Sequence, residues 1–318
     1  MRISPLTSAH LPQAAALFVQ SFQKQRRAVS VLPARMAKPQ LVADLLADRA
    51  QARAGLAALE GERLLGYLAW YYAKDFRGTG RKGAYCPEWG HACAQADSAP
   101  IYQALYRAAA TQWFAQGCQV HAITLLAHDR AAERDWFWNG FGLAVVDAAR
   151  PLRPLDAPPN TDLHIRQAGP ADARAFVDLD AEHRQHYTQA PVFMPRHPGF
   201  TAEDFHAHLS RPKNSIWLAL DGETPAGFLR FEGYDFEGAA IVASGQTISI
   251  NGAYMRPAYR RRGAGAAMLD AALRHYAGLG ITCCSVDFES FNPEAANFWM
   301  KHFQPVCFSL LRVPETLP

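Results

Sequence analysis

One short run between a predicted strand and a predicted helix constrains the fold of this chain most: Arg260-Arg261-Arg262-Gly263-Ala264-Gly265. The residues before it, 247–255, have the pattern of an extended strand, and apolar residues after it recur at helical spacing as far as Tyr276. Glycines at the start of a helix let the backbone turn tightly and leave amides free, and the helix dipole attracts anions. The run therefore predicts a phosphate-binding loop to which the arginines add positive charge. A solvated basic turn is the alternative.

A second motif follows this helix. Residues 283–288 are predicted to form a strand, and Asn292 and Pro293 then fit the cap and first turn of another helix. In this order the two motifs resemble the GNAT N-acetyltransferase superfamily over about residues 163–313. The acyl-CoA loop of that family has the form Arg/Gln-x-x-Gly-x-Gly/Ala, matched here by Arg260, Gly263 and Gly265.

The resemblance implies an α+β fold with a mixed, mostly antiparallel sheet flanked by helices. It also implies transfer of an acetyl group from acetyl-CoA to a small amine. In this fold the fourth and fifth strands splay apart, and the pantetheine arm of CoA lies between them. The backbone of Tyr254 and Met255 is expected to hold the arm, and Asn292 to bond to it unless it serves only as a helix cap. The residues expected at the phosphates are Arg260, Arg261, Arg262, Gly263, Ala264, Gly265 and Ala266.

The reaction is helped by a base near the thioester, and we expect Glu289 because it ends the fifth strand where the strands diverge. A helix-capping or surface carboxylate is the alternative for this residue. Tyr254 is a candidate acid or oxyanion partner, or else a packing ring. Trp299 stands where the family usually has its tyrosine acid, and it cannot donate a proton in the same way. The replacements that the sequence offers without ranking are Tyr187 and Tyr234. A non-catalytic acyl-CoA-binding or regulatory protein is therefore the second functional hypothesis.

An internal repeat organises the rest of the chain. The segment Ala58-Leu59-Glu60-Gly61-Glu62 matches Ala219-Leu220-Asp221-Gly222-Glu223 at an offset of 161 residues, and further matches follow in order. We therefore predict two tandem GNAT-like domains, 1–150 and 162–318, joined by a stiff proline-rich linker, 151–161.

The first copy is expected to have lost its phosphate loop. Aligning the helix ends puts Pro100 and Tyr102 at the positions of Gly263 and Gly265. A proline brings no amide proton and a tyrosine side chain crowds a phosphate, so this degenerate copy is expected to bind no acyl-CoA.

In the second copy the sequence predicts alternating strands and helices. The strands are expected near 163–167, 214–220, 226–233, 246–255, 281–288 and 304–312, and the helices near 170–182, 201–210, 263–278 and 293–301.

Composition and charge limit the kinds of partner that the protein is expected to bind. Charged residues make up 19% of the chain and hydrophobic residues 49%, as in an ordinary globular protein. Residues 1–150 carry 17 Lys and Arg against 11 Asp and Glu, but these charges are scattered, so nucleic acid is not expected as a partner. Residues 151–318 carry 15 against 18, which mildly favours a cationic amine as acceptor.

The six cysteines lack metal-ligand spacing, so we expect reduced, mostly buried thiols and no metal. A stretch rich in histidine is expected at the surface: His183, His186, His197, His206 and His208. The sequence contains neither a membrane-spanning segment nor a signal-peptide core, so a cytoplasmic protein is expected. A monomer or a homodimer is expected, because the tandem pair of domains can already serve as its own dimer.

Overall fold

The chain divides into two compact units, and a single cut does not separate them. The structure, a computed structural model, describes residues 1–94, 98–156, 159–233 and 238–316. Unit 1 comprises Met1–Asp147, Ala239–Ile241 and Pro305–Pro318, and unit 2 comprises Ala148–Gly238 and Val242–Gln304. The predicted domains are contiguous, whereas two segments from the second half of the chain belong to unit 1.

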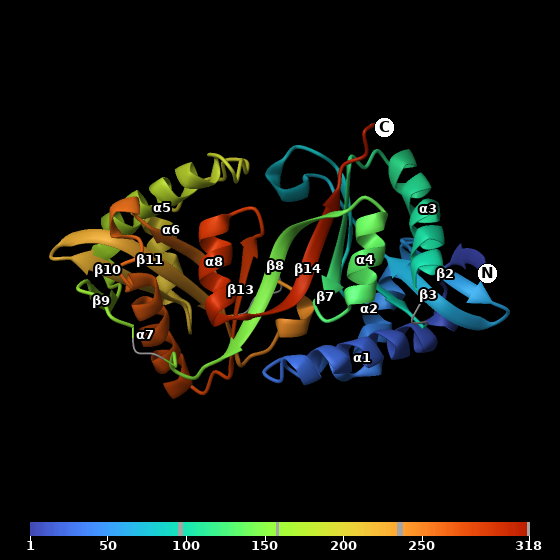
Figure 1. The fold of residues 1–318 in the computed structure, drawn as a ribbon, viewed down its shortest axis with the longest axis horizontal. Helices are drawn as coiled ribbons and strands as arrows, with labels where there is room; N and C mark the ends of the chain where they lie inside the picture. Colours follow the sequence, from blue (N-terminus) through green and yellow to red (C-terminus); the bar gives the residue numbers. More distant parts are fainter. Residues whose placement is uncertain (95–97, 157–158, 234–237, 317–318) are drawn as a thin grey trace. The chain divides into compact units, whose positions relative to one another are not determined.

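Two groups of paired strands form the sheets of unit 1 (Figure 1). One is antiparallel, in the order β1 (Arg2–Pro5), β2 (Gly55–Glu60), β3 (Arg63–Ala69) and β6 (His91–Cys93). The other has the order β4 (Tyr71–Ala73), β5 (Gly83–Cys86), β7 (Val120–Leu126) and β14 (Gln304–Arg312). The helices are α1 (Leu11–Ala28), α2 (Pro39–Gln51), α3 (Ala99–Ala115) and α4 (Arg130–Trp138), and β8 (Gly142–Pro151) contains the boundary between the units.

The last strand of the chain completes the first unit. β14 runs antiparallel to β7, with Cys307 opposite Leu126 and Arg312 opposite His121 (Figure 1). Leu310 of β14 is buried in the same apolar core as three tryptophans of the first half, Trp70, Trp113 and Trp136. The core of unit 1 is therefore built from both ends of the chain.

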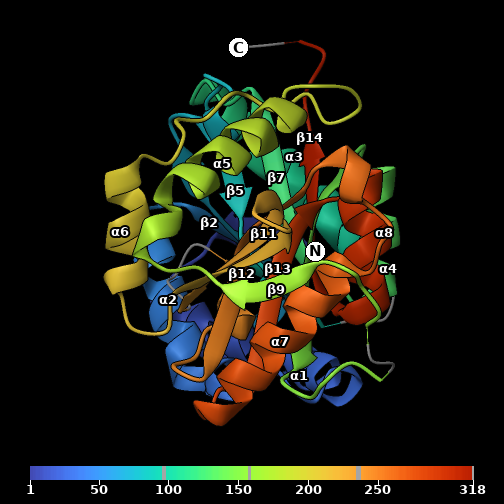
Figure 2. The ribbon, with the colours of Figure 1, turned by 90° about the vertical axis from the view of Figure 1, so that its left-hand side faces the viewer.

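Unit 2 has strands in the order β13 (Cys283–Glu289), β12 (Thr247–Met255), β11 (Thr224–Gly233), β10 (Ser215–Asp221) and β9 (His164–Gln167). Neighbouring strands are antiparallel except β12 and β13, which are parallel. Helices α5 (Ala173–Tyr187) and α6 (Ala202–Ser210) pack on one face, and α7 (Ala264–Gly278) packs on the other (Figure 2). α8 (Pro293–His302) follows β13 and packs beside it.

Alternation along β10 explains these layers. Its even-numbered residues Ile216 and Leu218 are buried against Phe176 of α5 and Phe205 of α6. On the opposite face, Ser215 Oγ lies 2.6 Å from the hydroxyl of Tyr276 on α7. Because successive side chains of a strand point to opposite faces, a strand buried on both sides requires helices on both sides. The predicted α+β class is confirmed.

The same hairpin occurs in both units. The turns of β2–β3 and β10–β11 each have a glycine with positive φ, Gly61 at 60° and Gly222 at 58°. Each hairpin also has a register shift at the matching place, after Ala58 in one and after Ala219 in the other. The sequence repeat is therefore also a repeat of backbone geometry.

The strands and helices predicted for the second half all occur. The largest difference is in α5, which the sequence ends near residue 182 and which continues to Tyr187. The six cysteines are free thiols, as predicted; five are buried and Cys93 is half-buried.

Candidate functional site

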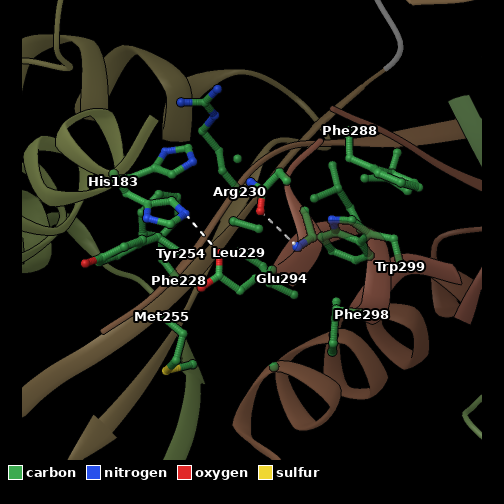
Figure 3. A pocket seen from close by; sticks show the side chains of 18 of the residues that line it. His183, Phe228, Leu229, Arg230, Tyr254, Met255, Phe288, Glu294, Phe298 and Trp299 are labelled. Carbon is green, nitrogen blue, oxygen red and sulfur yellow. Dashed lines mark hydrogen bonds and ion pairs between the residues drawn. The ribbon is translucent and has the colours of Figure 1, made fainter. Parts of the chain in front are cut away.

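A pocket of about 1090 Å³ in unit 2 gathers most of the predicted site residues. Its walls come from α5, β11, β12, the loop before α7, the start of α7, the end of β13 and α8 (Figure 3). The predicted residues that line it are Tyr254, Met255, Arg260, Arg261, Gly263, Ala264, Gly265, Ala266, Glu289 and Asn292.

The pocket lies where β12 and β13 part. Their parallel pairing runs from Thr247 and Cys283 to Ile250 and Val286, and in the described residues it ends there. Beyond a bulge at Asn251, β12 still pairs with β11 through Gly252–Met255. One edge of this stretch can therefore hydrogen-bond an extended ligand as a neighbouring strand would.

The loop before α7 offers backbone amides to an anion. Gly263 caps the helix with φ 76°, and Arg261 before it is also left-handed, with φ 62°. A Cβ on Gly263 would clash with the carbonyl oxygen of Asn160, so this position requires glycine for space as well as for φ. Because the first amides of a helix have no acceptor within it, Ala264, Gly265 and Ala266 present donors where the dipole also favours negative charge.

The three arginines of the loop point to different places. Arg260 donates from Nε to the carbonyl of Met255 at 3.0 Å and from Nη1 to Oε1 of Glu294 at 2.7 Å. Arg261 is exposed at the pocket wall, and no ion pair is recorded for it in the described part of the chain. Arg262 is not among the described residues that line the pocket.

The prediction that Arg262 binds phosphate is therefore not supported by its position. Its guanidinium forms an ion pair with Asp162, lies 3.9 Å from a carboxylate oxygen of Asp221, and stacks 5.3 Å from the ring of Tyr259. The left-handed turn at Arg261 sends the next side chain away from the pocket. Arg262 holds Asp162, the first residue after the linker, near Asp221 at the end of β10.

Glu289 belongs to a buried polar cluster. It is 8% exposed at the end of β13, and its carboxylate accepts a hydrogen bond from the hydroxyl of Tyr187. The same hydroxyl bonds to Asn292, whose own side chain caps α8 by accepting from the amide of Ala295 at 3.2 Å. Burial raises the pKa of Tyr187 strongly, and the carboxylates of Glu289 and Asp287 raise it further. Of the two unranked tyrosines, Tyr187 thus lies beside the predicted base, and Tyr234 lies outside the described residues.

Tyr254 is arranged differently. Its hydroxyl bonds to Glu182, which also receives a bidentate pair from Arg256. Burial raises the pKa of Tyr254, and Glu182 adds to the increase. Figure 3 shows the ring between His183 and Met255 with its hydroxyl directed away from Glu294 and Trp299. Its backbone suits the predicted binding role, whereas its hydroxyl is already engaged.

Trp299 packs rather than reacts. It is 3% exposed and forms edge contacts with Phe298 and Phe303, at ring distances of 4.7 and 5.5 Å. It lines the pocket opposite Tyr254 (Figure 3).

The five histidines predicted at the surface divide: His197 and His206 are exposed, as predicted, whereas His183 and His186 are half-buried and His208 is buried. His183, His186 and His197 line the pocket, and His208 is only 5% exposed. Burial lowers the pKa of His183 to about 4 and that of His208 to about 4. The signal that could have placed them is helical spacing: His183, His186 and Tyr187 continue one face of α5 beyond the predicted end.

Comparison with known proteins agrees with this geometry. Residues 179–303 match the model of the acetyltransferase (GNAT) family. This region of the chain belongs to the GNAT family. A GCN5-related N-acetyltransferase from Sphaerobacter thermophilus has the same fold with TM-score 0.57 and 13% identity, over 100% of this chain and 97% of that one. No curated protein sequence matches the chain.

A second structure shares the fold, the GCN5-related glucosamine N-acetyltransferase region of a fungal multi-domain GH3 β-N-acetylglucosaminidase. It has TM-score 0.55 and 12% identity, over 98% of this chain and 38% of that one. At these identities the likeness concerns the fold. Because both matches span the two units, the GNAT-like architecture extends beyond the region that the family model covers.

The GNAT site fits an acyl-CoA by its own residues. The pocket joins the first amides of a helix, the edge of β12 beyond its pairing with β13, and the cation of Arg261, for which no ion pair is recorded in the described residues. Among the described residues no group of three or more His, Cys, Asp or Glu is placed to hold a metal ion. In the same residues, no helix is long and apolar enough to cross a membrane.

Proposed function

We propose that this protein transfers an acetyl group from acetyl-CoA to the nitrogen of a small amine. One observation carries the proposal: the first amides of α7, the open edge of β12 and the buried carboxylate of Glu289 share a single pocket. The first two features suit phosphates and an extended pantetheine arm, and the third suits a base.

In this proposal the phosphates bind to the amides of Ala264, Gly265 and Ala266, with Arg261 and Arg260 adding charge. The backbone of Tyr254 and Met255 holds the pantetheine arm, and an amide of β12 beyond the bulge polarises the thioester carbonyl. Holding amine and thioester together supplies much of the rate.

The amine nitrogen attacks the thioester carbon, forming the C–N bond while the C–S bond breaks. Glu289 takes the proton that the nitrogen loses, and the leaving thiolate needs one. Tyr187 can give its hydroxyl proton to the thiolate while Glu289 passes the proton that it captured to the oxygen of Tyr187. Because its pKa is raised, the hydroxyl stays protonated and acts only through this exchange. The proposed relay replaces the acid that Trp299 cannot supply.

The first test is calorimetric titration of the full chain with acetyl-CoA, using a matched pair of variants. Ala266→Asp places a carboxylate at the pocket wall, and Ala267→Asp places one on the next residue, which is not in the described lining. Both add negative charge to a helix start, where it is tolerated. We expect one site in the wild type, abolished by Ala266→Asp and kept by Ala267→Asp. Absence of binding to the wild type would refute the proposal.

The second test separates catalysis from binding. Release of free thiol is measured with a panel of amines, and Glu289→Gln is expected to lower kcat by about 10²–10⁴-fold with unchanged affinity for acetyl-CoA. Binding without turnover for any acceptor would favour the alternative, a non-catalytic acyl-CoA-binding protein, which the buried Trp299 and the engaged hydroxyl of Tyr254 support.

We further propose that the two units arose by tandem duplication and that the first no longer binds acyl-CoA. Tyr102, which the sequence aligns with Gly265, is 2% exposed and bonds through its hydroxyl to His91 Nδ1 at 3.0 Å. A core side chain thus fills this position. Two acetyl-CoA sites in the titration would contradict the proposal. The cytoplasmic location, the absence of a nucleic acid partner and the oligomeric state stay predictions.

A further inference from the structure

Two polar side chains form one wall of the pocket away from the phosphate loop. Arg230 comes from β11 beside the bulge of β12, and His183 comes from α5 (Figure 3). The bulge precedes the part of β12 that is proposed to hold pantetheine. In the proposed binding mode the phosphates lie at the start of α7 and the arm runs along β12, so we assign the wall at the bulge to the acceptor.

Arg230 is held firmly and keeps one nitrogen for a ligand. Its side chain is 13% exposed. Nη2 donates to the carbonyl of Asn251 at 2.6 Å, Nε lies 3.2 Å from Oε1 of Glu232, and the guanidinium lies 4.5 Å from the ring of Phe200. Nε is buried and makes no hydrogen bond of good geometry despite its ion pair with Glu232, and in the described residues no partner is recorded for Nη1. The guanidinium carbon would lie 3.5 Å from a Cβ on Gly252, so it covers the backbone at the bulge.

His183 adds a second free polar atom. Its Nε2 is buried, and no hydrogen-bond partner is found for it among the described residues. Burial lowers the pKa of this histidine to about 4, so the ring is neutral at pH 7 and can donate one hydrogen bond.

The two acidic side chains nearest to Arg230 and His183 are already paired within the protein. Asp180 lines the pocket but accepts from Arg184 Nε at 2.7 Å and from the amide of Phe200 at 3.0 Å. Glu232 is paired with Arg230 and is not in the described lining. The groups of this wall that can still form hydrogen bonds are therefore donors, and donors suit an oxygen atom of the acceptor. The two carboxylates already balance the two arginines, which favours a singly charged group over a phosphate dianion.

We propose that the acceptor amine also carries a carboxylate, and that Arg230 and His183 bind it. The inference rests on the proposed acetyl transfer and narrows its substrate to the class of amino acids and their derivatives. Arg230 fixes the carboxylate while the amino group lies toward Glu289. The acceptor is then zwitterionic in solution, and its ammonium group loses one proton to solvent before the nitrogen attacks. This class refines the cationic amine suggested by the charge of the second half.

The test compares matched acceptors on the wild-type protein, with acetyl-CoA saturating and free thiol as the readout. The panel holds the common amino acids, the amide of each, and glucosamine as an amine without a carboxylate. We expect at least one acid to exceed its own amide by about 10- to 100-fold in kcat/KM, the ratio typical of one charge-assisted bond. Amides equal to their acids, or turnover with glucosamine and none of the acids, would overturn the inference.

Variants then assign the group. Arg230→Met is expected to erase the difference between acid and amide, and Arg230→Lys to keep part of it, while acetyl-CoA affinity stays unchanged. The control is Arg166→Met, which removes an arginine of β9 that pairs with Asp172 at 2.7 Å outside the pocket. If Arg230→Met does not fold, Arg230→Lys and the comparison of acids with amides on the wild type still test whether a carboxylate is recognised. Turnover without acid preference would defeat only this inference, whereas loss of acetyl-CoA binding by the wild type would defeat the proposed function.

Discussion

Arg260 and Glu294 form an ion pair across the pocket, with Nη1 2.7 Å from Oε1, and it joins the loop before α7 to the first turn of α8. The other carboxylate oxygen of Glu294 lies 3.4 Å from Nε2 of His186 on α5. Arg260 also occupies the carbonyl of Met255. The pair thus lies between the groups proposed for the phosphates and those proposed for pantetheine, so a bound acyl-CoA competes with Glu294 for Arg260.

Replacing Glu294 by Gln should therefore tighten acetyl-CoA binding. The side chains of Arg260 and Glu294 are 27% and 51% exposed, so solvent screens the pair and the gain is about two- to fivefold in Kd. Titration calorimetry measures it. Glu133→Gln, which breaks an exposed pair with Arg130 in unit 1, is the control and leaves Kd unchanged. Weaker binding by Glu294→Gln would show that this residue helps to hold the ligand.

Tyr187→Phe should slow turnover, because the hydroxyl beside Glu289 is lost. We expect kcat to fall by about 10²-fold with little change in the Kd of acetyl-CoA. Tyr254→Phe, whose hydroxyl is bound to Glu182, should have a smaller effect on kcat. The reverse order of the two effects would assign the acid to Tyr254.

Arg261 and Arg262 should behave differently although they are adjacent. Arg261→Met removes an exposed cation at the pocket and should weaken acetyl-CoA binding by about three- to tenfold, the value of one phosphate contact. Arg262→Met should leave Kd unchanged and instead loosen the chain at Asp162, directly after the linker, seen as faster proteolysis there. Equal losses of affinity would mean that Arg262 turns into the pocket when the ligand binds.

His121 is one of the buried histidines, with His183 and His208, through which stability should fall in mild acid. Burial, then Arg312, lowers its pKa in the folded state to about 4, below the ordinary 6.5. The unfolded chain therefore binds the proton first, and folding free energy is lost as pH falls from 6.5 toward 4, by up to about 3 kcal/mol. Urea unfolding at pH 7 and pH 4.5 measures the loss, and His121→Leu should reduce it. An unchanged difference between the two pH values would mean that His121 titrates normally.

Leu310→Ala should destabilise unit 1 although the residue is close to the end of the chain. It is 4% exposed in the core beside Trp113, so the cost is about 2–5 kcal/mol. Its half-buried neighbour gives the control: Leu311→Ala should cost less. Urea unfolding followed by tryptophan fluorescence makes the comparison. Equal and small losses would mean that β14 adds little to the core.

The parts of the site that sequence could predict are those fixed by local backbone chemistry. Gly263, the helix cap at Asn292 and the hairpin turns at Gly61 and Gly222 each fix a local backbone conformation, so the sequence alone can identify them. The strand edge at Tyr254 and Met255 is expected from the resemblance to the GNAT superfamily.

The parts that sequence could not predict depend on side-chain direction and on distant contacts. One left-handed residue, Arg261, decides that Arg262 leaves the pocket. The length of α5 decides that Tyr187 reaches Glu289, which lies about a hundred residues further along the chain. The membership of β14 in unit 1 depends on pairing with β7, for which the pattern of either strand contains no signal.

That pairing also sets the order in which the protein can mature. A ribosome releases residues 1–147 long before it makes the strand that closes their sheet, so unit 1 waits with β7 unpaired on one side while the intervening chain emerges. The first half of the gene product should therefore be poorly soluble when expressed alone. Adding the segment 304–318 as a separate peptide should rescue it.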